Sequence, residues 1–457
     1  MAPILVIAIL LIGLFLIATE NINRMNKAAV AIFTGMACWM VCLLWGTDDI
    51  ARLNAHELSV INSGLSDSGF SIQEFISYTL FGSYIKSACE IVFFMLAIMT
   101  IVEVLNNNGC FDFVNDILKR LTPVQFMWFL AIFTFLVSAN LDNLTTACLM
   151  LAIVHSVIPT ESLRRLYGFV VLISANLGGT FTVIGDTTSL TLWANGLVTA
   201  THYSAMLVLP CLAALITILL LLSNKLPHHI RYSGHIAPYR GDDTILNGWQ
   251  RILMLIVGIG GLWFIPTFHR LTEFPPFLGA LCVLSLLWIV NELCNRTLMY
   301  SDQMVNKKLP MAMQYANVQN LLFYLGIVLA FGAVNEIGVL QKAADFLIQN
   351  LNNEYILACI AGIESVFINS ITSIVGNSIM FSHVTDNATF ATDAMFWPLM
   401  SFCTSLGGMV LGTGTLAGLY YIRMEEVSIG TYLKHYTWKI MLGWVVGIIV
   451  FLLVGLM

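Results

Sequence analysis

Charged residues are scarce in this chain. Only 10% of its 457 residues are Asp, Glu, Lys or Arg, while 58% are hydrophobic and the mean hydropathy is +0.85. Many apolar runs approach the ~20 residues that cross a hydrocarbon core. This composition excludes a water-soluble domain, and we expect an all-α polytopic membrane protein.

Three other absences narrow the class further. The net charge is -6 and no long basic tract is present, which argues against a nucleic-acid partner. The ten cysteines include no Cys-x-x-Cys pair and lie mostly in or beside apolar segments, so they are interpreted as small buried hydrophobes. The first apolar segment, Pro3–Ala18, lacks a basic leader and a small-residue cleavage site. It is therefore predicted to be a retained span rather than a signal peptide.

The apolar runs predict about ten transmembrane helices and two longer polar-interrupted segments. The predicted spans are Pro3–Ala18, Ala28–Gly46, Glu90–Asn106, Tyr167–Asn195, Ser204–Ser223, Trp249–Thr267, Pro276–Leu293, Gln319–Glu336, Phe396–Ile422 and Trp438–Met457. The longer segments cover about residues 126–158 and 355–383. Between the second and third spans, the polar loop Thr47–Ser87 is predicted to carry a surface helix near Ile72–Phe81.

The segment Ser138–Thr146 places polar residues in the middle of an apolar run. A carboxylate at bilayer depth costs about 2.5–3.5 kcal/mol on insertion scales, so Asp142 needs partners, water or a function. Its polar neighbours Asn140, Asn143, Thr145 and Thr146 carry oxygen atoms, which hard cations such as sodium prefer. Taken alone, the same residues could simply hold helices together by hydrogen bonds.

An internal repeat changes the weight of these two interpretations. The corresponding segments are Phe94–Gly109 with Phe323–Gly338, Ser138–Thr146 with Ser365–Ser373, and Leu177–Thr187 with Leu406–Leu416. Polar and glycine-rich interruptions at equivalent places of two halves are the best sequence indication of a transporter site built from broken helices. We therefore divide the chain into a first repeat (1–224), a cytoplasmic linker (225–248) and a second repeat (249–457).

The distribution of Lys and Arg predicts the topology. Lys119 and Arg164 fall on the same side of the membrane only if the segment between them, about 126–158, is a re-entrant hairpin. With a second hairpin at about 355–383 and an outside N-terminus, only Arg52, Lys86, Arg270 and Lys342 remain outside. The two repeats then cross the membrane in opposite directions. This inverted topology follows from the placement of Lys and Arg and was not assumed.

This arrangement brings the two hairpin tips close to two helices that are broken at 178–186 and 407–415. The candidate ion and proton ligands are Asp142, Asn143, Thr145, Thr146, Asn176, Asp186, Thr187 and Thr188 in the first half, and Asn369, Ser370, Thr372, Thr413 and Thr415 in the second. Asp142 and Asp186 are the charged ligands that we expect sodium to contact, since freed helix carbonyls and hydroxyls can complete an oxygen shell.

At these residues the sequence resembles the NhaD-type sodium/proton antiporters of the ion-transporter superfamily. The resemblance is carried by Met99–Glu103, Ser138–Thr146 and the pair Asn176–Gly179 and Ile184–Thr188. It implies an inverted-repeat fold, export of sodium or lithium in exchange for protons, and functional roles that include Glu103 as a proton relay. One departure is that Asn369-Ser370 stands where the family usually carries Asp-Asn, and Thr372 where a Pro is common. The second site is therefore predicted to lack a titrating charge.

These observations predict a secondary transporter rather than an enzyme. Its cargo would be Na⁺ or Li⁺ and H⁺, with no cofactor, in a bacterial cytoplasmic membrane, and the sequence allows a homodimer. Cation and proton would compete for the desolvated carboxylates of Asp142 and Asp186. Two alternatives stay open: a sodium-coupled symporter of a dicarboxylate or another oxyanion, and, more remotely, an intramembrane aspartyl protease that uses the same two residues.

Overall fold

The structure is a computed structural model that describes residues 2–63, 71–224, 226–227, 232, 246–296, 318–351, 353–384 and 387–456. The described residues form helices and short connections and contain no β-strand. Seven helices are long and apolar enough to cross a membrane, and several shorter apolar helices accompany them in this part of the chain. The predicted all-α polytopic membrane fold is confirmed.

The elements of the first half are α1 (Ala2–Ala18), α2 (Glu20–Asn23), α3 (Lys27–Trp45), α4 (Thr47–Leu53), α5 (Ala55–Ser63), α6 (Ile72–Glu74), η1 (Phe75–Leu80), α7 (Phe81–Asn107), α8 (Asp112–Leu118), α9 (Pro123–Ser138), α10 (Asn143–Val157), α11 (Glu161–Thr180), α12 (Thr187–Ala194) and α13 (Ala200–Ser223). Those of the second half are α14 (Gly248–Leu255), η2 (Ile256–Gly260), α15 (Gly261–Thr272), α16 (Pro276–Cys294), α18 (Val318–Glu336), α19 (Val339–Leu351), α20 (Glu354–Ile368), α21 (Ser370–Phe381), η5 (Ala388–Phe390), α22 (Phe396–Val410), α23 (Leu416–Met424), α24 (Ile429–Tyr432), η6 (Leu433–Thr437) and α25 (Trp438–Gly455).

Both predicted hairpins are present. In the first, α9 and α10 are joined by a short turn at residues 139–142, and Pro123 starts α9 at a position where its missing N–H costs nothing. In the second, α20 and α21 are joined at Asn369 alone, whose backbone has a positive φ of 88°. Their arms are only 12–16 residues long, so each is shorter than a full span.

Both predicted broken helices are present as well. The first consists of α11 and α12 with an interruption at 181–186, and the second of α22 and α23 with an interruption at 411–415. Glycine is required where α22 passes the second hairpin, because a Cβ on Gly407 would lie 2.0 Å from the carbonyl oxygen of Gly362. The equivalent contact in the first half is Gly178 against the carbonyl oxygen of Phe135, at 2.3 Å.

The two halves repeat individual hydrogen bonds. Ser138 Oγ, at the end of α9, donates to the Ala175 carbonyl of α11 at 2.6 Å. Its repeat mate Ser365 Oγ, in α20, donates to the Thr404 carbonyl of α22 at 2.5 Å. Since Ala175 and Thr404 are also equivalent in the alignment, the register predicted from the sequence matches the packing. The division at residue 224 and the role of residues 225–248 stay predictions, and most of that linker lies outside the described residues.

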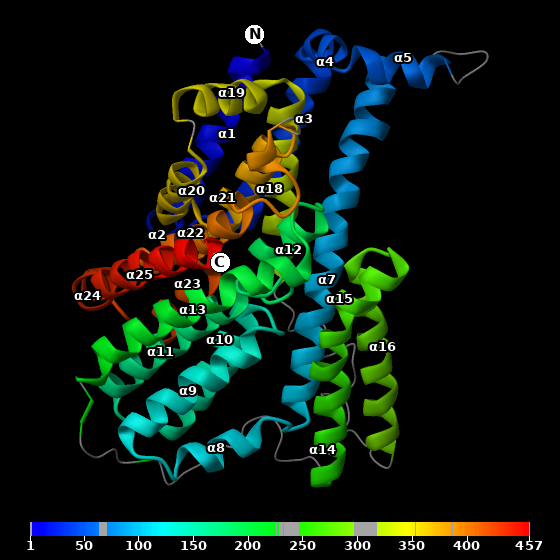
Figure 1. Ribbon diagram of the computed structural model, residues 1–457. Coiled ribbons are helices and arrows are strands. Elements are labelled where there is room, and N and C mark those ends of the chain that lie inside the picture. The colour runs from blue at the N-terminus through cyan, green and yellow to red at the C-terminus, as the bar shows by residue number, and fades with distance from the viewer. Residues whose placement is uncertain are drawn as a thin grey trace.

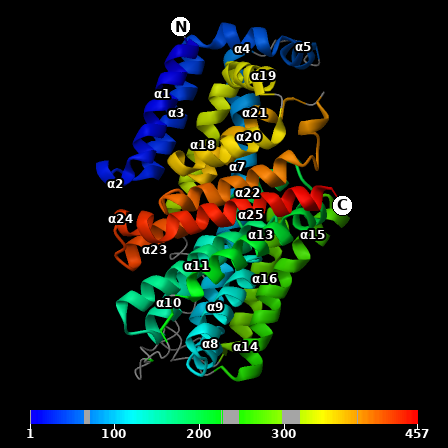
Figure 2. The same ribbon diagram turned by 60° about the vertical axis from the view of Figure 1, so that its left-hand side comes forward.

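Each half packs its outer helices against the other half. Helix α3 lies along α18, and α16 lies along α7. Figure 1 shows these two groups at opposite ends of the long helix α7, with α1, α3 and α18 above and α14, α15 and α16 below. Helices α13, α22 and α25 cross the middle of the molecule, as Figure 2 shows from another side. The second arm of each hairpin contacts the opposite half, α10 against α23 and α21 against α12.

The predicted surface helix near Ile72–Phe81 is wrong in its placement. The chain from Ile72 continues through η1 directly into α7, giving one helical stretch of 36 residues from Ile72 to Asn107. Phe75, Ile76 and Leu80 are buried, so this stretch packs into the protein and is not a surface helix. The predicted span at Glu90–Asn106 therefore starts too late, because the polar residues between Ser71 and Lys86 obscured its beginning.

Candidate functional site

Asp142 is held by the helix that follows it. The residue is the N-cap of α10, and its Oδ2 accepts hydrogen bonds from the backbone N–H groups of Leu144 at 3.1 Å and Thr145 at 3.3 Å. The hydroxyl of Thr145 lies 3.4 Å from the same oxygen. Only 5% of Asp142 is exposed. The positive end of the α10 dipole stabilises a carboxylate here.

Asp186 occupies the corresponding position before α12. It is 6% exposed, and its Oδ2 accepts a hydrogen bond from Thr188 Oγ1 at 2.8 Å. Asp142 and Asp186 are close enough for their charges to interact, so the structure brings the two predicted carboxylates into one region. Asn143 lies beside Asp186 and donates from Nδ2 to Asn176 Oδ1 at 3.2 Å. Four predicted residues thus surround the two acids with amide and hydroxyl groups.

Two other predicted ligands in the first half point elsewhere. Thr146 Oγ1 is directed at the Leu141 carbonyl at 3.5 Å, and Thr187 Oγ1 faces Met95 Sδ of α7 at 3.6 Å. Neither hydroxyl contacts a carboxylate in this conformation. Both residues lie in the first turn of their helices, α10 and α12, with their hydroxyls directed away from the acids.

Glu103 lies near the second arm of the first hairpin. Its charge interacts with the thiol of Cys148 on α10, and the same thiol is within electrostatic range of Asp142 and contacts the Tyr420 hydroxyl. Cys148 is six residues beyond Asp142 along α10, towards the end that carries His155. Glu103 is therefore placed beside the first hairpin arm, near the same thiol that is within electrostatic range of Asp142.

The second hairpin tip is neutral. Asn369 Oδ1 accepts from Ile371 N at 2.9 Å, and Ser370 N donates to the Gly414 carbonyl at 2.9 Å. Thr415 Oγ1 caps α23 by accepting from Gly418 N at 3.1 Å. Thr372 Oγ1 is buried and has no hydrogen-bond partner among the described residues. The tip is thus a structural mirror of the first one without its acids.

A buried lysine beside this tip was missed by the sequence analysis. Lys27 is 8% exposed, and it lines a small cavity of about 20 Å³ together with Asn369, Thr413 and Glu20. Its ammonium lies 5.2 Å from the ring centre of Phe323, and Glu20 lies 3.3 Å from Arg423. The only sequence indication was a basic residue directly before the predicted span Ala28–Gly46.

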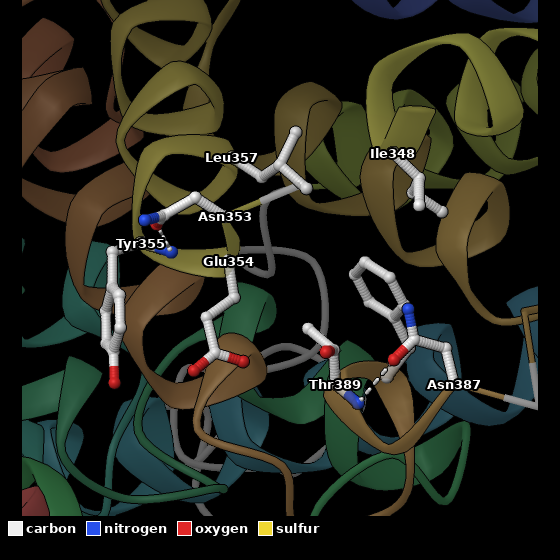
Figure 3. Close-up of a pocket in the computed structure, with 8 residues that line it drawn as sticks. Ile348, Asn353, Glu354, Tyr355, Leu357, Asn387 and Thr389 are labelled. Atoms are coloured by element: carbon white, nitrogen blue, oxygen red, sulfur yellow. Dashed lines mark hydrogen bonds between the residues drawn. The ribbon is translucent and has the colours of Figure 1, made fainter. Parts of the chain in front are cut away.

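Another cavity lies at the beginning of the second hairpin. It measures about 250 Å³ and is lined by residues that include Asn353, Glu354, Tyr355, Asn387 and Thr389. Figure 3 shows these side chains around it. None of the predicted ion ligands lines this cavity, so its size does not make it the candidate site.

The inverted hairpins, the broken helices and the buried polar centre define a secondary membrane transporter. Over residues 14–402 the chain matches the family model CitMHS, described as a citrate transporter, and it belongs to that family. It is 31% identical to sodium/proton antiporter 2 of Arabidopsis thaliana over 449 residues, which cover 97% of each chain. It is 26% identical to the Na⁺/H⁺ antiporter NhaD of Vibrio cholerae over 397 residues, covering 80% of this chain and 78% of the relative.

A solved structure shows the same fold. The chain superposes on the YdaH transporter of Alcanivorax borkumensis with a TM-score of 0.53 and 13% identity, covering 90% of this chain and 98% of that one. The predicted resemblance and the multi-pass integral membrane location are confirmed. The protein is a secondary transporter and not an enzyme, which removes the aspartyl protease alternative.

Proposed function

We propose that the protein exchanges sodium or lithium for protons, with the two species competing at Asp142 and Asp186. The observation that carries this proposal is the buried pair of interacting carboxylates surrounded by amide and hydroxyl groups. Two buried acids without a counter-cation are costly, so a proton or a monovalent cation must accompany them. The names of the relatives in Arabidopsis thaliana and Vibrio cholerae support the same pair of ions.

Exchange follows if both carboxylates are reached from only one side at a time. When a sodium ion binds, the carboxylates must give up their protons, and when they are reprotonated the ion is released. The backbone N–H groups of Leu144 and Thr145 hold Asp142 in place in both states. We expect sodium to leave the cytoplasm and protons to enter it, with movement of the hairpins relative to α3, α7 and α18 changing the accessible side.

The second candidate function is cation-coupled transport of an oxyanion. Two observations favour it: the family description names citrate, and the buried Lys27 lines a cavity at the second hairpin tip. Against it stand the two acids of the first half, which would repel an anion, and Glu20, which lies in the same cavity as Lys27.

The two functions are separated by purified protein in proteoliposomes that contain a pH-sensitive dye. An antiporter acidifies or alkalinises the lumen when sodium or lithium is added alone, with chloride or gluconate as the counter-ion. An oxyanion symporter needs the dicarboxylate or tricarboxylate and accumulates it when labelled. If proton movement requires an added dicarboxylate or tricarboxylate, and is absent with sodium chloride or sodium gluconate, the exchange proposal is overturned.

A further inference from the structure

A cavity of about 250 Å³ lies at the contact of the two halves. Helices α7 and α12 of the first half and α18 and α21 of the second enclose it. Its lining is rich in neutral polar groups, which include Tyr84, Ser87, Asn195, Ser378 and His383, and it contains no Lys, Arg, Asp or Glu among the described residues. Hydroxyl and amide oxygens can solvate a cation without trapping it, so this lining suits a passage for hydrated monovalent cations.

The cavity leads towards Asp186. Thr191 and Asn195 line it, and they are four and eight residues beyond Thr187, so the three share one face of α12 and of the turn that follows. Thr191 Oγ1 donates to the Thr187 carbonyl at 2.7 Å. Because Asp186 is the N-cap of α12, the floor of the cavity is little more than one helical turn from the carboxylate.

A contact between the two halves closes this floor. The hydroxyl of Tyr324 in α18 lies 3.2 Å from Thr191 Oγ1 in α12, and both residues are 1% exposed. The contact joins α12 to a helix of the opposite half. Relative movement of the two halves would separate the hydroxyls and open the cavity towards Asp186, without any helix unfolding.

The opposite end of the cavity is bordered by a hydrogen-bonded group. Tyr84 Oη donates to Glu336 Oε1 at 2.8 Å and accepts from Asn335 Nδ2 at 3.1 Å. The same Asn335 amide lies 2.9 Å from Nε2 of His383, and the His383 side chain is exposed. The topology predicted from Lys and Arg places this end outside, because Lys342, which follows Glu336 closely in the chain, is one of the four basic residues on that side, whereas Lys119 and Arg164 fall on the inner side. Glu336 thus places a negative charge at the rim, which attracts cations.

We propose that this cavity is the outer access route to the ion site and that the Thr191–Tyr324 contact is its gate. The route would carry sodium outwards and protons inwards, and in that sense the inference rests on the proposed function. Its geometry can be tested without any transport, because a pathway open to the outside admits a water-soluble thiol reagent whether or not the protein exchanges ions.

The test uses single-cysteine variants of the full chain with the native cysteines replaced. Ser378→Cys lies on the cavity wall, Thr187→Cys lies below the gate, and Ser174→Cys is a matched control that is buried in α11 away from the cavity. A membrane-impermeant methanethiosulfonate is applied to one side of oriented vesicles at a time. We expect Ser378→Cys to react from the outside only, at least tenfold faster than Thr187→Cys, and Ser174→Cys to stay unlabelled.

Opening the gate provides the second measurement. Tyr324→Ala should raise the outside labelling rate at position 187 at least fivefold, whereas Tyr167→Ala, which removes an equally buried ring elsewhere, should leave it unchanged. If the Ala variants do not fold, Tyr324→Phe and the sidedness of Ser378→Cys still decide the question. Labelling of Ser378→Cys from the inside, or at the rate of Ser174→Cys, would overturn the route, and an unchanged rate at 187 would overturn the gate. Failure of ion exchange with outside labelling intact would instead contradict the proposed function alone.

Discussion

At the scale of single residues, both acids of the first half receive backbone and side-chain hydrogen bonds. At Asp186 the Thr188 hydroxyl donates to the carboxylate at 2.8 Å. This side-chain contact can be removed by a single substitution. The predicted effect is on cation binding, because a hydroxyl that orients the carboxylate also supplies an oxygen to a bound ion.

Thr188→Val should raise the sodium concentration that gives half-maximal exchange about tenfold, since a hydrogen bond to a charged group contributes about 1.5 kcal/mol. Thr188→Ser keeps the hydroxyl and is the matched control. The measurement is sodium-dependent dye dequenching in proteoliposomes at fixed pH. Equal sodium dependence of the Val and Ser variants would show that the hydroxyl contact with Asp186 plays no part in binding.

Variants of Asn369 and Lys27 test whether the second hairpin tip lacks a titrating charge because of Asn369. Asn369→Asp adds a carboxylate to the cavity that Lys27 lines, so the two charges should compensate and the pH profile of exchange should change little. In the double variant Asn369→Asp/Lys27→Met the new carboxylate has no such partner and holds a proton more tightly. We therefore expect the profile of the double variant to shift to higher pH. If the single and double variants have the same profile, Lys27 does not act on position 369.

At the scale of elements, the hairpins and broken helices depend on backbone contacts that tolerate no side chain. A Cβ at Gly407 would collide with the Gly362 carbonyl, whereas a Cβ at Gly430 in α24 would meet no atom within 4 Å. The repeat register is the part of this arrangement that sequence can reveal, because Ser138, Ser365 and the glycines occur in the same order in both halves.

Gly407→Ala should lower the stability of the protein by about 1–3 kcal/mol or prevent its accumulation, because the collision is with backbone and cannot be relieved by a rotamer change. Gly430→Ala should be neutral. Thermal unfolding in detergent, followed by fluorescence-detected size exclusion, measures both. Equal melting temperatures for the two variants would mean that α20 and α22 are not packed as described.

Other elements could not be predicted from the sequence. The chain between Ile72 and Leu80 carries enough polar residues to resemble a surface helix, yet its apolar side chains are buried and it continues into α7. Lys27 directly precedes the predicted span Ala28–Gly46, and hydropathy cannot show that a charge at the end of a span is covered by another helix. The backbone of Asn369 has a positive φ, which Asn adopts more readily than most residues, but no pattern specified it.

At the scale of the whole molecule, the two halves are related by inverted topology. It places Lys119 and Glu161, which flank the first hairpin, on the inner side, and Arg52 on the outer side. The same topology predicts Asp386 on the outer side of the membrane, and this residue is not among those that the structure describes. The homodimer stays a prediction.

Cysteines introduced at positions 52, 119 and 161 give a direct test of this topology. Lys119→Cys and Glu161→Cys should react with an impermeant thiol reagent only from the inner side, and Arg52→Cys, which is a well-exposed position, only from the outer side. Sidedness is read by gel shift in intact cells and in inverted vesicles. Labelling of positions 119 and 161 from opposite sides would turn the hairpin into an ordinary span and remove the inverted repeat.

The proposed exchange depends on the carboxylate of Asp142, which gives up a proton when a cation binds. Asp142→Asn keeps the volume and an oxygen that can accept from the amides of α10, but it removes the charge and the exchangeable proton. The variant should fold and accumulate as the original chain does. The decisive measurement is sodium-induced proton movement by purified Asp142→Asn in proteoliposomes at saturating sodium. We predict that this movement is absent, and exchange at the rate of the original chain would contradict the proposed function of this site.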